Sequence, residues 1–115
     1  MIRPPEFRIL TDEDDGTVRV QLHGELDLAT APRLDVELQR IRRLDGLRRV
    51  VVDLRSLAFL DSTGLETIVS LDRAARAEGF ELAVVRGPRA VERLFAVMQL
   101  DRTLRIVDDP AELSR

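Results

Sequence analysis

Apolar and polar residues alternate near the start of the chain, and this pattern predicts a β-hairpin. Between residues 18 and 23, valine and leucine alternate with arginine, glutamine and histidine, the two-residue period of a half-buried strand. Residues 7–24 therefore read as two strands. Asp14, Asp15 and Gly16 supply the turn, because they tolerate the backbone angles of a tight reversal. The acidic residues 12–15 lack the spacing of a calcium-binding loop, so we interpret them as solvated.

After Asp27 the apolar spacing changes to three and four residues, which predicts a helix. Thr30 is a good capping residue, and Pro32 fits the first helical turn, where a missing N–H group costs little. Gly46 ends the helix. The apolar stripe consists of Leu34, Leu38, Ile41 and Leu44.

The same spacing predicts two further helices, and a capping pattern predicts a last one. One runs from Leu65 to near Gly79, and another begins at Pro88. Residues 109–112 (Asp-Pro-Ala-Glu) have the pattern of a cap for a final helix. The helix after Pro88 has the clearest periodicity in the chain, with a stripe of Val91, Leu94, Phe95 and Met98.

Short apolar runs between these helices predict parallel strands. The three consecutive valines of residues 50–52 indicate a central strand covered on both faces, and residues 80–85 and 104–107 form two more strands. We interpret residues 55–60 as a connection. Because strands then alternate with helices, the sequence predicts an α/β fold with one mixed, mostly parallel sheet of four to five strands, packed against about four helices. A chain of 115 residues fits a single domain, 1–115.

Composition removes several classes of function. The chain has no cysteine, and all 18 of its basic residues are arginine, so thiolate chemistry and lysine Schiff bases are excluded. A net charge of −3 argues against nucleic-acid binding. The apolar runs are far shorter than the ~20 residues that span a bilayer, and the proline-containing N-terminus lacks a signal-type stretch. We therefore expect a cytoplasmic protein with no nucleic-acid or membrane partner.

The candidate chemistry lies in the polar step Asp61-Ser62-Thr63-Gly64, which separates an apolar approach from the second helix. One interpretation is structural, since all three polar residues favour helix N-termini and Thr63 with Glu66 spells a capping box. The other is functional. A helix N-terminus favours anions, and a phosphorylated serine there would add about −1.5 to −2 charges beside Asp61.

Other candidate catalytic residues also have simple structural interpretations. His23 is the only histidine, so any serine-histidine-aspartate triad must use it, and we interpret it as a solvated surface residue. Asp53 ends an apolar strand, where either a catalytic carboxylate or one bonded to neighbouring backbone would fit. Glycine-rich nucleotide loops are absent, and we expect no cofactor and no metal site.

Three segments resemble a known family, the STAS-domain anti-sigma factor antagonists of bacteria. The strongest is "VVVDLRSLAFLDSTGLETIVSLDRAA", residues 50–75, which contains the family's Asp-Ser-(Ser/Thr)-Gly-Leu motif in its strand-to-helix context. "GELDLATAPRL", residues 24–34, is similar to the family's first strand-to-helix segment, and residues 90–100 look like its third helix. The resemblance spans nearly the whole chain.

The resemblance implies a partner-switching protein that is not an enzyme. The resemblance implies that the unphosphorylated chain binds an anti-sigma factor that is also a serine kinase. Phosphorylation of Ser62 then releases that partner, and a phosphatase resets the switch. Asp27 matches a family position near the partner surface, with weaker neighbours at Glu25, Leu28 and Thr30. The expected partner-binding residues are Glu25, Asp27, Thr30, Asp61, Ser62, Thr63 and Gly64.

Two alternatives remain open at this stage. The chain could be a STAS accessory subunit of a lipid transporter or another multi-protein complex, without phosphate switching. It could also be a serine or nucleotide hydrolase that uses Ser62 as nucleophile and His23 as base, whose turnover His23→Ala would abolish.

Overall fold

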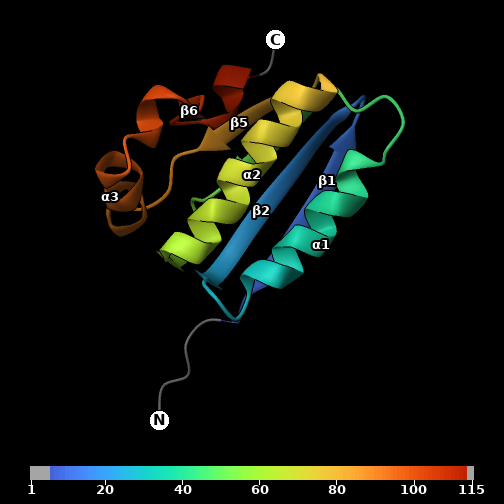
Figure 1. Cartoon of the computed structure of the whole chain (residues 1–115). Coiled ribbons are helices and arrows are strands. Elements are labelled where there is room, and N and C mark those ends of the chain that lie inside the picture. Colours follow the sequence, from blue (N-terminus) through green and yellow to red (C-terminus); the bar gives the residue numbers. More distant parts are fainter. Residues whose placement is uncertain (1–5, 114–115) are drawn as a thin grey trace.

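The computed structural model describes residues 6–113, and residues 1–5 of the N-terminal stretch on which the cytoplasmic expectation partly rests lie outside them. The described chain alternates strands and helices after an initial hairpin (Figure 1). Its elements are β1 (Arg8–Asp14), β2 (Thr17–Leu26), α1 (Ala31–Arg42), β3 (Arg49–Asp53), β4 (Leu57–Leu60), α2 (Ser62–Glu78), β5 (Glu81–Val85), α3 (Arg89–Val97), the 3-10 helix η1 (Leu100–Arg102), β6 (Ile106–Val107) and the 3-10 helix η2 (Pro110–Leu113).

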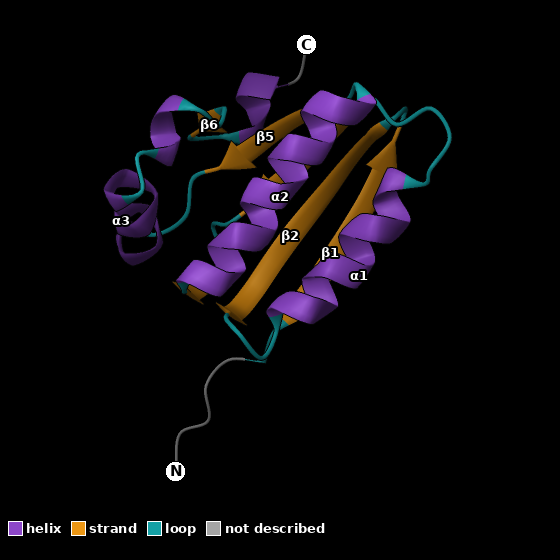
Figure 2. Ribbon diagram, viewed as in Figure 1, coloured by secondary structure: helices purple, strands orange, loops and turns teal. Residues whose placement is uncertain are grey.

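The strands form one mixed sheet in the order β1-β2-β3-β5-β6, with β4 paired to β2 off this path. Only the β1–β2 hairpin is antiparallel. Helices α1 and α2 lie side by side across one face of the sheet (Figures 1 and 2). The predicted α/β fold with a mostly parallel sheet is confirmed. No helix within residues 6–113 is long and apolar enough to span a membrane.

The sheet has one strand that the sequence pattern did not reveal. Residues 55–60 were expected to be a connection, yet Leu57–Leu60 form β4. The ten-residue β2 pairs with β3 through its first half and with β4 from Gly24 onward, so β3 and β4 act as one long strand interrupted by a turn. A four-residue strand with its two apolar ends buried has no clear two-residue period, which is why it resembled a loop.

The core lies between the sheet and the two helices. The alternating positions Val18, Val20 and Leu22 are at most 2% exposed, as the hairpin pattern predicted. The middle strand β3 is buried on both faces, because Val50 and Val52 join the main core while Val51 packs in a second cluster behind the sheet. That second cluster consists of Val51, Ala83, Val85, Val107 and Leu113.

The C-terminal part differs from the expected fourth helix. Asp109 does act as a cap, since its Oδ1 accepts a hydrogen bond from the Ala111 N–H, while the Glu112 carboxylate accepts from two backbone N–H groups. Within the described residues, however, the cap is followed only by the single 3-10 turn η2, so three α-helices replace the expected four. In α3, Met98 belongs to the predicted stripe but is 55% exposed, because it caps the end of the helix.

Candidate functional site

Asp61 starts helix α2. Its backbone is extended, and its Oδ1 accepts a hydrogen bond of 2.8 Å from the Gly64 N–H, the geometry of a side-chain N-cap. The interpretation of Thr63 and Glu66 as a capping box is therefore wrong, and Glu66 instead lies 3.3 Å from the Arg73 guanidinium. The second carboxylate oxygen of Asp61 accepts a 3.1 Å hydrogen bond from the Leu28 N–H. One side chain thus joins two segments that are 33 residues apart.

Gly64 lets this helix start approach the end of β2. A Cβ atom at this position would lie 2.7 Å from both the Cγ and the carbonyl oxygen of Leu26, and 2.9 Å from a Leu60 methyl group. Such distances are far inside van der Waals contact. Gly64 is buried, so its role in the structure is to admit Leu26 beneath the first turn of α2.

Ser62 and Thr63 occupy the outer side of the same turn and are both exposed. The Ser62 hydroxyl makes no hydrogen bond to any other described residue. The first turn of α2 contains no acidic side chain, so the partial positive charge of the helix N-terminus is balanced only by the Asp61 cap. The site therefore presents a free hydroxyl where an added anion would be well placed.

The neighbouring loop, from β2 to α1, is held by its own side chains. Asp27 Oδ1 accepts hydrogen bonds from the N–H groups of Ala29 and Thr30. Thr30 Oγ1 accepts from the Asp27 N–H at 2.9 Å and donates to the Glu25 carbonyl oxygen at 2.7 Å. Thr30 is the N-cap residue of α1, as predicted, but its hydroxyl ties the loop instead of capping the helix.

The fold brings these two segments together at the carboxyl ends of parallel strands. Asp61 N–H donates to the Leu26 carbonyl oxygen at 3.2 Å, and Glu25 lies opposite Phe59 in the β2–β4 ladder. Figure 2 shows the loop that follows β2 beside the start of α2. All the residues predicted for the partner surface therefore gather at one edge. The Glu25 carboxylate has no hydrogen bond or ion pair within residues 6–113.

His23 does not lie as predicted. It is only partly exposed, and its Nε2 atom is buried without a hydrogen-bond partner among the described residues. The interpretation as a solvated surface histidine is wrong because β1 pairs along this stretch, with Arg8 directly opposite His23. No hydrogen bond joins His23 to Ser62 in the described structure, so the geometry gives no support to a serine hydrolase.

Asp53 has a structural role at the turn between β3 and β4. The residue is 3% exposed, and its carboxylate accepts hydrogen bonds from the Arg55 backbone N–H at 3.1 Å and from the Arg55 guanidinium at 2.8 Å. Burial favours a raised pKa for this carboxyl, but the side-chain and backbone hydrogen bonds from Arg55 outweigh it and hold the pKa below its ordinary value. Of the two interpretations of Asp53, the structure supports the carboxylate bonded to neighbouring backbone.

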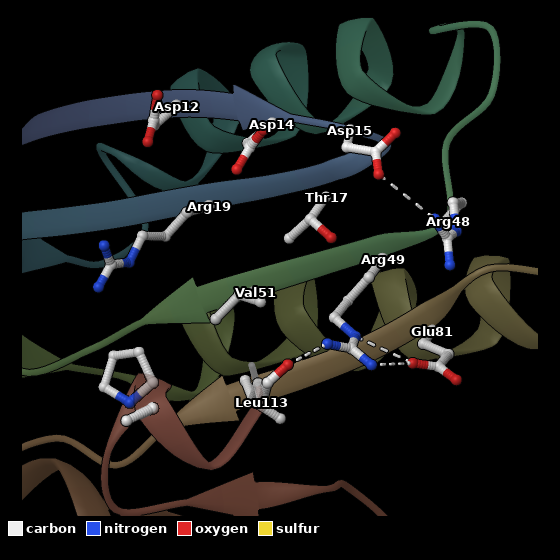
Figure 3. Close-up of a pocket in the computed structure, with 12 residues that line it drawn as sticks. Asp12, Asp14, Asp15, Thr17, Arg19, Arg48, Arg49, Val51, Glu81 and Leu113 are labelled. Atoms are coloured by element: carbon white, nitrogen blue, oxygen red, sulfur yellow. Dashed lines mark hydrogen bonds and ion pairs between the residues drawn. The ribbon is translucent and has the colours of Figure 1, made fainter. Parts of the chain in front are cut away.

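A groove of about 820 Å³ lies toward the starts of the parallel strands, on the face of the sheet away from α1 and α2, between the β1–β2 hairpin and η2 (Figure 3). Arg49 is tied there to the Glu81 carboxylate at 2.9 Å and to the Leu113 carbonyl oxygen at 2.6 Å, while Arg48 lies 3.8 Å from Asp15. The acidic turn is exposed, as expected, but the sequence did not reveal the arginines facing it. Arg48 lies just before β3, Arg49 begins β3, and a third groove arginine, Arg19, lies on β2, so only the parallel register of β2 and β3 places them together.

Comparison with known proteins identifies the family. A model of the STAS domain family matches residues 8–113. An anti-sigma-B factor antagonist of Staphylococcus aureus (strain NCTC 8325 / PS 47) is 32% identical over 100 residues, which cover 87% of this chain and 92% of that protein. This chain belongs to the STAS domain family of anti-sigma factor antagonists.

Solved structures agree with this assignment. The crystal structure of an anti-sigma factor antagonist from Mycobacterium paratuberculosis superposes with a TM-score of 0.79 and is 25% identical, covering 93% of this chain and 90% of that one. The antagonist SpoIIAA in its unphosphorylated form, at 17% identity, shares the STAS fold with a TM-score of 0.79 over 96% of this chain and 95% of its own. The phosphorylated form of the Bacillus SpoIIAA has a TM-score of 0.72 at 16% identity, over 96% of this chain and 98% of its own.

Proposed function

We propose that this chain is a phosphate-switched anti-sigma factor antagonist. The unphosphorylated chain binds an anti-sigma factor that is also a serine kinase, and so frees a sigma factor. Transfer of the γ-phosphoryl group of ATP to the Ser62 hydroxyl ends the binding, and a phosphatase restores it. The chain itself acts as substrate and binding partner, not as an enzyme.

The observation that carries this proposal is the free hydroxyl of Ser62. It is exposed on the first turn of α2 and makes no hydrogen bond within residues 6–113, so a kinase can reach it without unfolding the helix. The Asp61 cap fixes the backbone on one side and the buried Gly64 fixes it on the other. A rigid, accessible and unbonded hydroxyl is what a protein substrate must offer to phosphoryl transfer.

The relatives support the antagonist role. The Staphylococcus aureus protein is named as an anti-sigma-B factor antagonist, and SpoIIAA has been solved in both unphosphorylated and phosphorylated forms. Asp61, Ser62, Thr63, Glu25, Asp27 and Thr30 lie on one edge of the sheet, which supports a single partner surface there, with Gly64 beneath it.

Electrostatics explain how phosphate would act as a switch. The phosphate adds about −1.5 to −2 charges directly beside the Asp61 carboxylate. Solvent and the helix N-terminus can accommodate that charge in the free protein. In a complex the dianion must lose its hydration, which costs several kcal/mol unless the partner supplies cations. A loss of about 3 kcal/mol weakens binding by about two orders of magnitude.

The proposal is tested by binding measurements on Ser62 variants with the anti-sigma factor kinase of the same organism. Ser62→Ala should bind as tightly as the unphosphorylated chain and resist release by ATP, whereas Ser62→Asp should bind at least tenfold more weakly by calorimetry. Thr63→Ala and Thr63→Asp provide the matched control at the neighbouring exposed hydroxyl, and both should bind within a few-fold of the unmodified chain. Equal affinities of Ser62→Ala and Ser62→Asp would overturn the switch.

A further inference from the structure

Two residues whose backbone lies near Asp61 have large, exposed apolar side chains. Leu28, in the loop between β2 and α1, is 73% exposed, the highest value among the exposed large apolar residues of the described chain. Phe59, in β4, is 46% exposed. Exposing such side chains to water costs free energy that burial against a partner would recover.

Phe59 is unusual among the aromatic residues of this chain. The chain has four phenylalanines and no tyrosine or tryptophan. Phe7, Phe80 and Phe95 are at most 8% exposed and belong to the core, so Phe59 alone presents an aromatic ring to solvent. Aromatic side chains at protein surfaces are strongly enriched at the energetic centres of interfaces.

Leu28 and Phe59 both lie on backbone that is held close to Asp61. The Leu28 N–H donates to Asp61 Oδ2 at 3.1 Å, and Phe59 precedes Asp61 by two residues in a strand paired with β2. The backbone that carries the two apolar side chains is therefore held near Asp61 by a hydrogen bond and a strand ladder. Such preorganisation reduces the entropy lost on binding.

We propose that Leu28 and Phe59 are the apolar anchors through which the unphosphorylated chain docks on the anti-sigma factor. This inference rests on the proposed function and names the residues that supply its affinity. The occupant follows from position, because the Leu28 N–H donates to Asp61 and Phe59 lies two residues before Asp61, so a protein that docks its kinase site on Ser62 reaches this part of the surface. Apolar anchors supply affinity without charge. The charge of the phosphate on Ser62 therefore decides whether binding is switched on or off.

The test uses the full chain and the anti-sigma factor kinase of the same organism, with affinities measured by calorimetry. Leu28→Ala and Phe59→Ala should each weaken binding about thirtyfold, the effect of removing an interface hot spot of about 2 kcal/mol. Val36→Ala and Leu10→Ala are matched controls, because Val36 on α1 is 70% exposed and Leu10 on β1 is 45% exposed. Neither control should change affinity more than twofold.

The outcomes separate this inference from the function on which it rests. If the unmodified chain binds but Leu28→Ala and Phe59→Ala bind equally tightly, the anchor assignment is overturned while the antagonist function stands. If the controls weaken binding as much as the two variants do, the docking surface lies elsewhere, and the assignment again fails. If the unmodified chain does not bind, both proposals are overturned. All four variants should keep the circular dichroism spectrum of the unmodified chain, since each replaced side chain is exposed.

Discussion

Helices α1 and α2 begin side by side at the same edge of the sheet, each with a hydroxyl-bearing residue at its start. At α1 the hydroxyl of Thr30 is fully used, because it accepts from the Asp27 N–H and donates to the Glu25 carbonyl oxygen. At α2 the carboxylate of Asp61 does the capping, and the hydroxyl of Ser62 makes no hydrogen bond within residues 6–113.

The difference shows how a hydroxyl is kept available for modification. A serine at the capping position would accept a hydrogen bond from a backbone N–H group through its oxygen, as serine and threonine caps commonly do. Because Asp61 occupies that position, Ser62 is moved one residue into the helix and faces solvent. Asp61 also fixes the Thr30 loop through Leu28, so the start of α2 helps to hold the loop that precedes α1.

Among variants at the two helix starts, Gly64→Ala should have the largest effect on the free energy of unfolding. The new methyl group would meet the Leu26 carbonyl oxygen at 2.7 Å, and backbone cannot move aside cheaply, so we expect a loss of about 3 kcal/mol in the free energy of unfolding. Urea denaturation followed by circular dichroism measures it. Ser70→Ala, an exposed change farther along α2, is the control and should change stability by less than about 0.5 kcal/mol. A Gly64→Ala variant as stable as this control would contradict the close packing of the helix start.

Asp61→Ala should have the next largest effect. The change removes the cap of α2 and the bridge to Leu28 together, which we expect to cost about 2.5 kcal/mol. Hydrogen exchange by NMR should show faster exchange of both the Gly64 and the Leu28 amides. Faster exchange at Gly64 alone would mean that Asp61 caps α2 without holding the neighbouring loop.

Acid titration tests the turn between β3 and β4, the strand that leads to Asp61 at the edge of the sheet. The pKa of Asp53 is lowered in the folded protein, although burial opposes this, because Arg55 hydrogen-bonds the ionised form. Its stabilising contribution is therefore complete above the unfolded value of about 3.9 and is lost as the pH falls through the folded-state pKa.

We expect Asp53→Asn to be about 1.5 kcal/mol less stable than the unmodified chain at pH 7, with the difference shrinking steadily below about pH 4. Thermal unfolding across this pH range measures the difference. A difference that stays constant down to pH 2 would show that the charge of Asp53 does not contribute.

The smallest expected changes in stability compare the hydroxyls of Thr30 and Ser62 directly. Thr30→Ala removes two hydrogen bonds and should cost about 1 kcal/mol, whereas Ser62→Ala removes none within the described chain and should change stability by less than about 0.5 kcal/mol. Denaturant unfolding of the two variants makes the comparison. Equal losses would mean that the Ser62 hydroxyl is hydrogen-bonded in solution and is not a free group.

Much of this arrangement could be predicted from the sequence, because local patterns encode it. The alternation at Val18, Val20 and Leu22, the valines of β3 and the stripe of α1 all reflect burial that each segment requires by itself. The polar step at residues 61–64 was also predicted to cap α2, but the helix was expected from Leu65 and begins at Ser62, with Asp61 alone as its side-chain cap.

The remaining features depend on contacts between distant segments. β4 exists because β2 is long enough to pair beyond the end of β3, and no local period reveals that. His23 is partly buried by a neighbouring strand, and the groove arginines meet the acidic turn only through the parallel register. The bond between Asp61 and Leu28 spans 33 residues, so the sequence could indicate both residues but not their contact.

Phosphoryl transfer followed by site mapping tests the central claim most directly. The chain is incubated with ATP and the anti-sigma factor kinase of the same organism, and the modified peptide is sequenced by mass spectrometry. The account predicts one phosphate, on Ser62, and none after Ser62→Ala. Phosphate on Thr30 or Thr63 with Ser62 unmodified, or full modification of the Ser62→Ala chain, would contradict it.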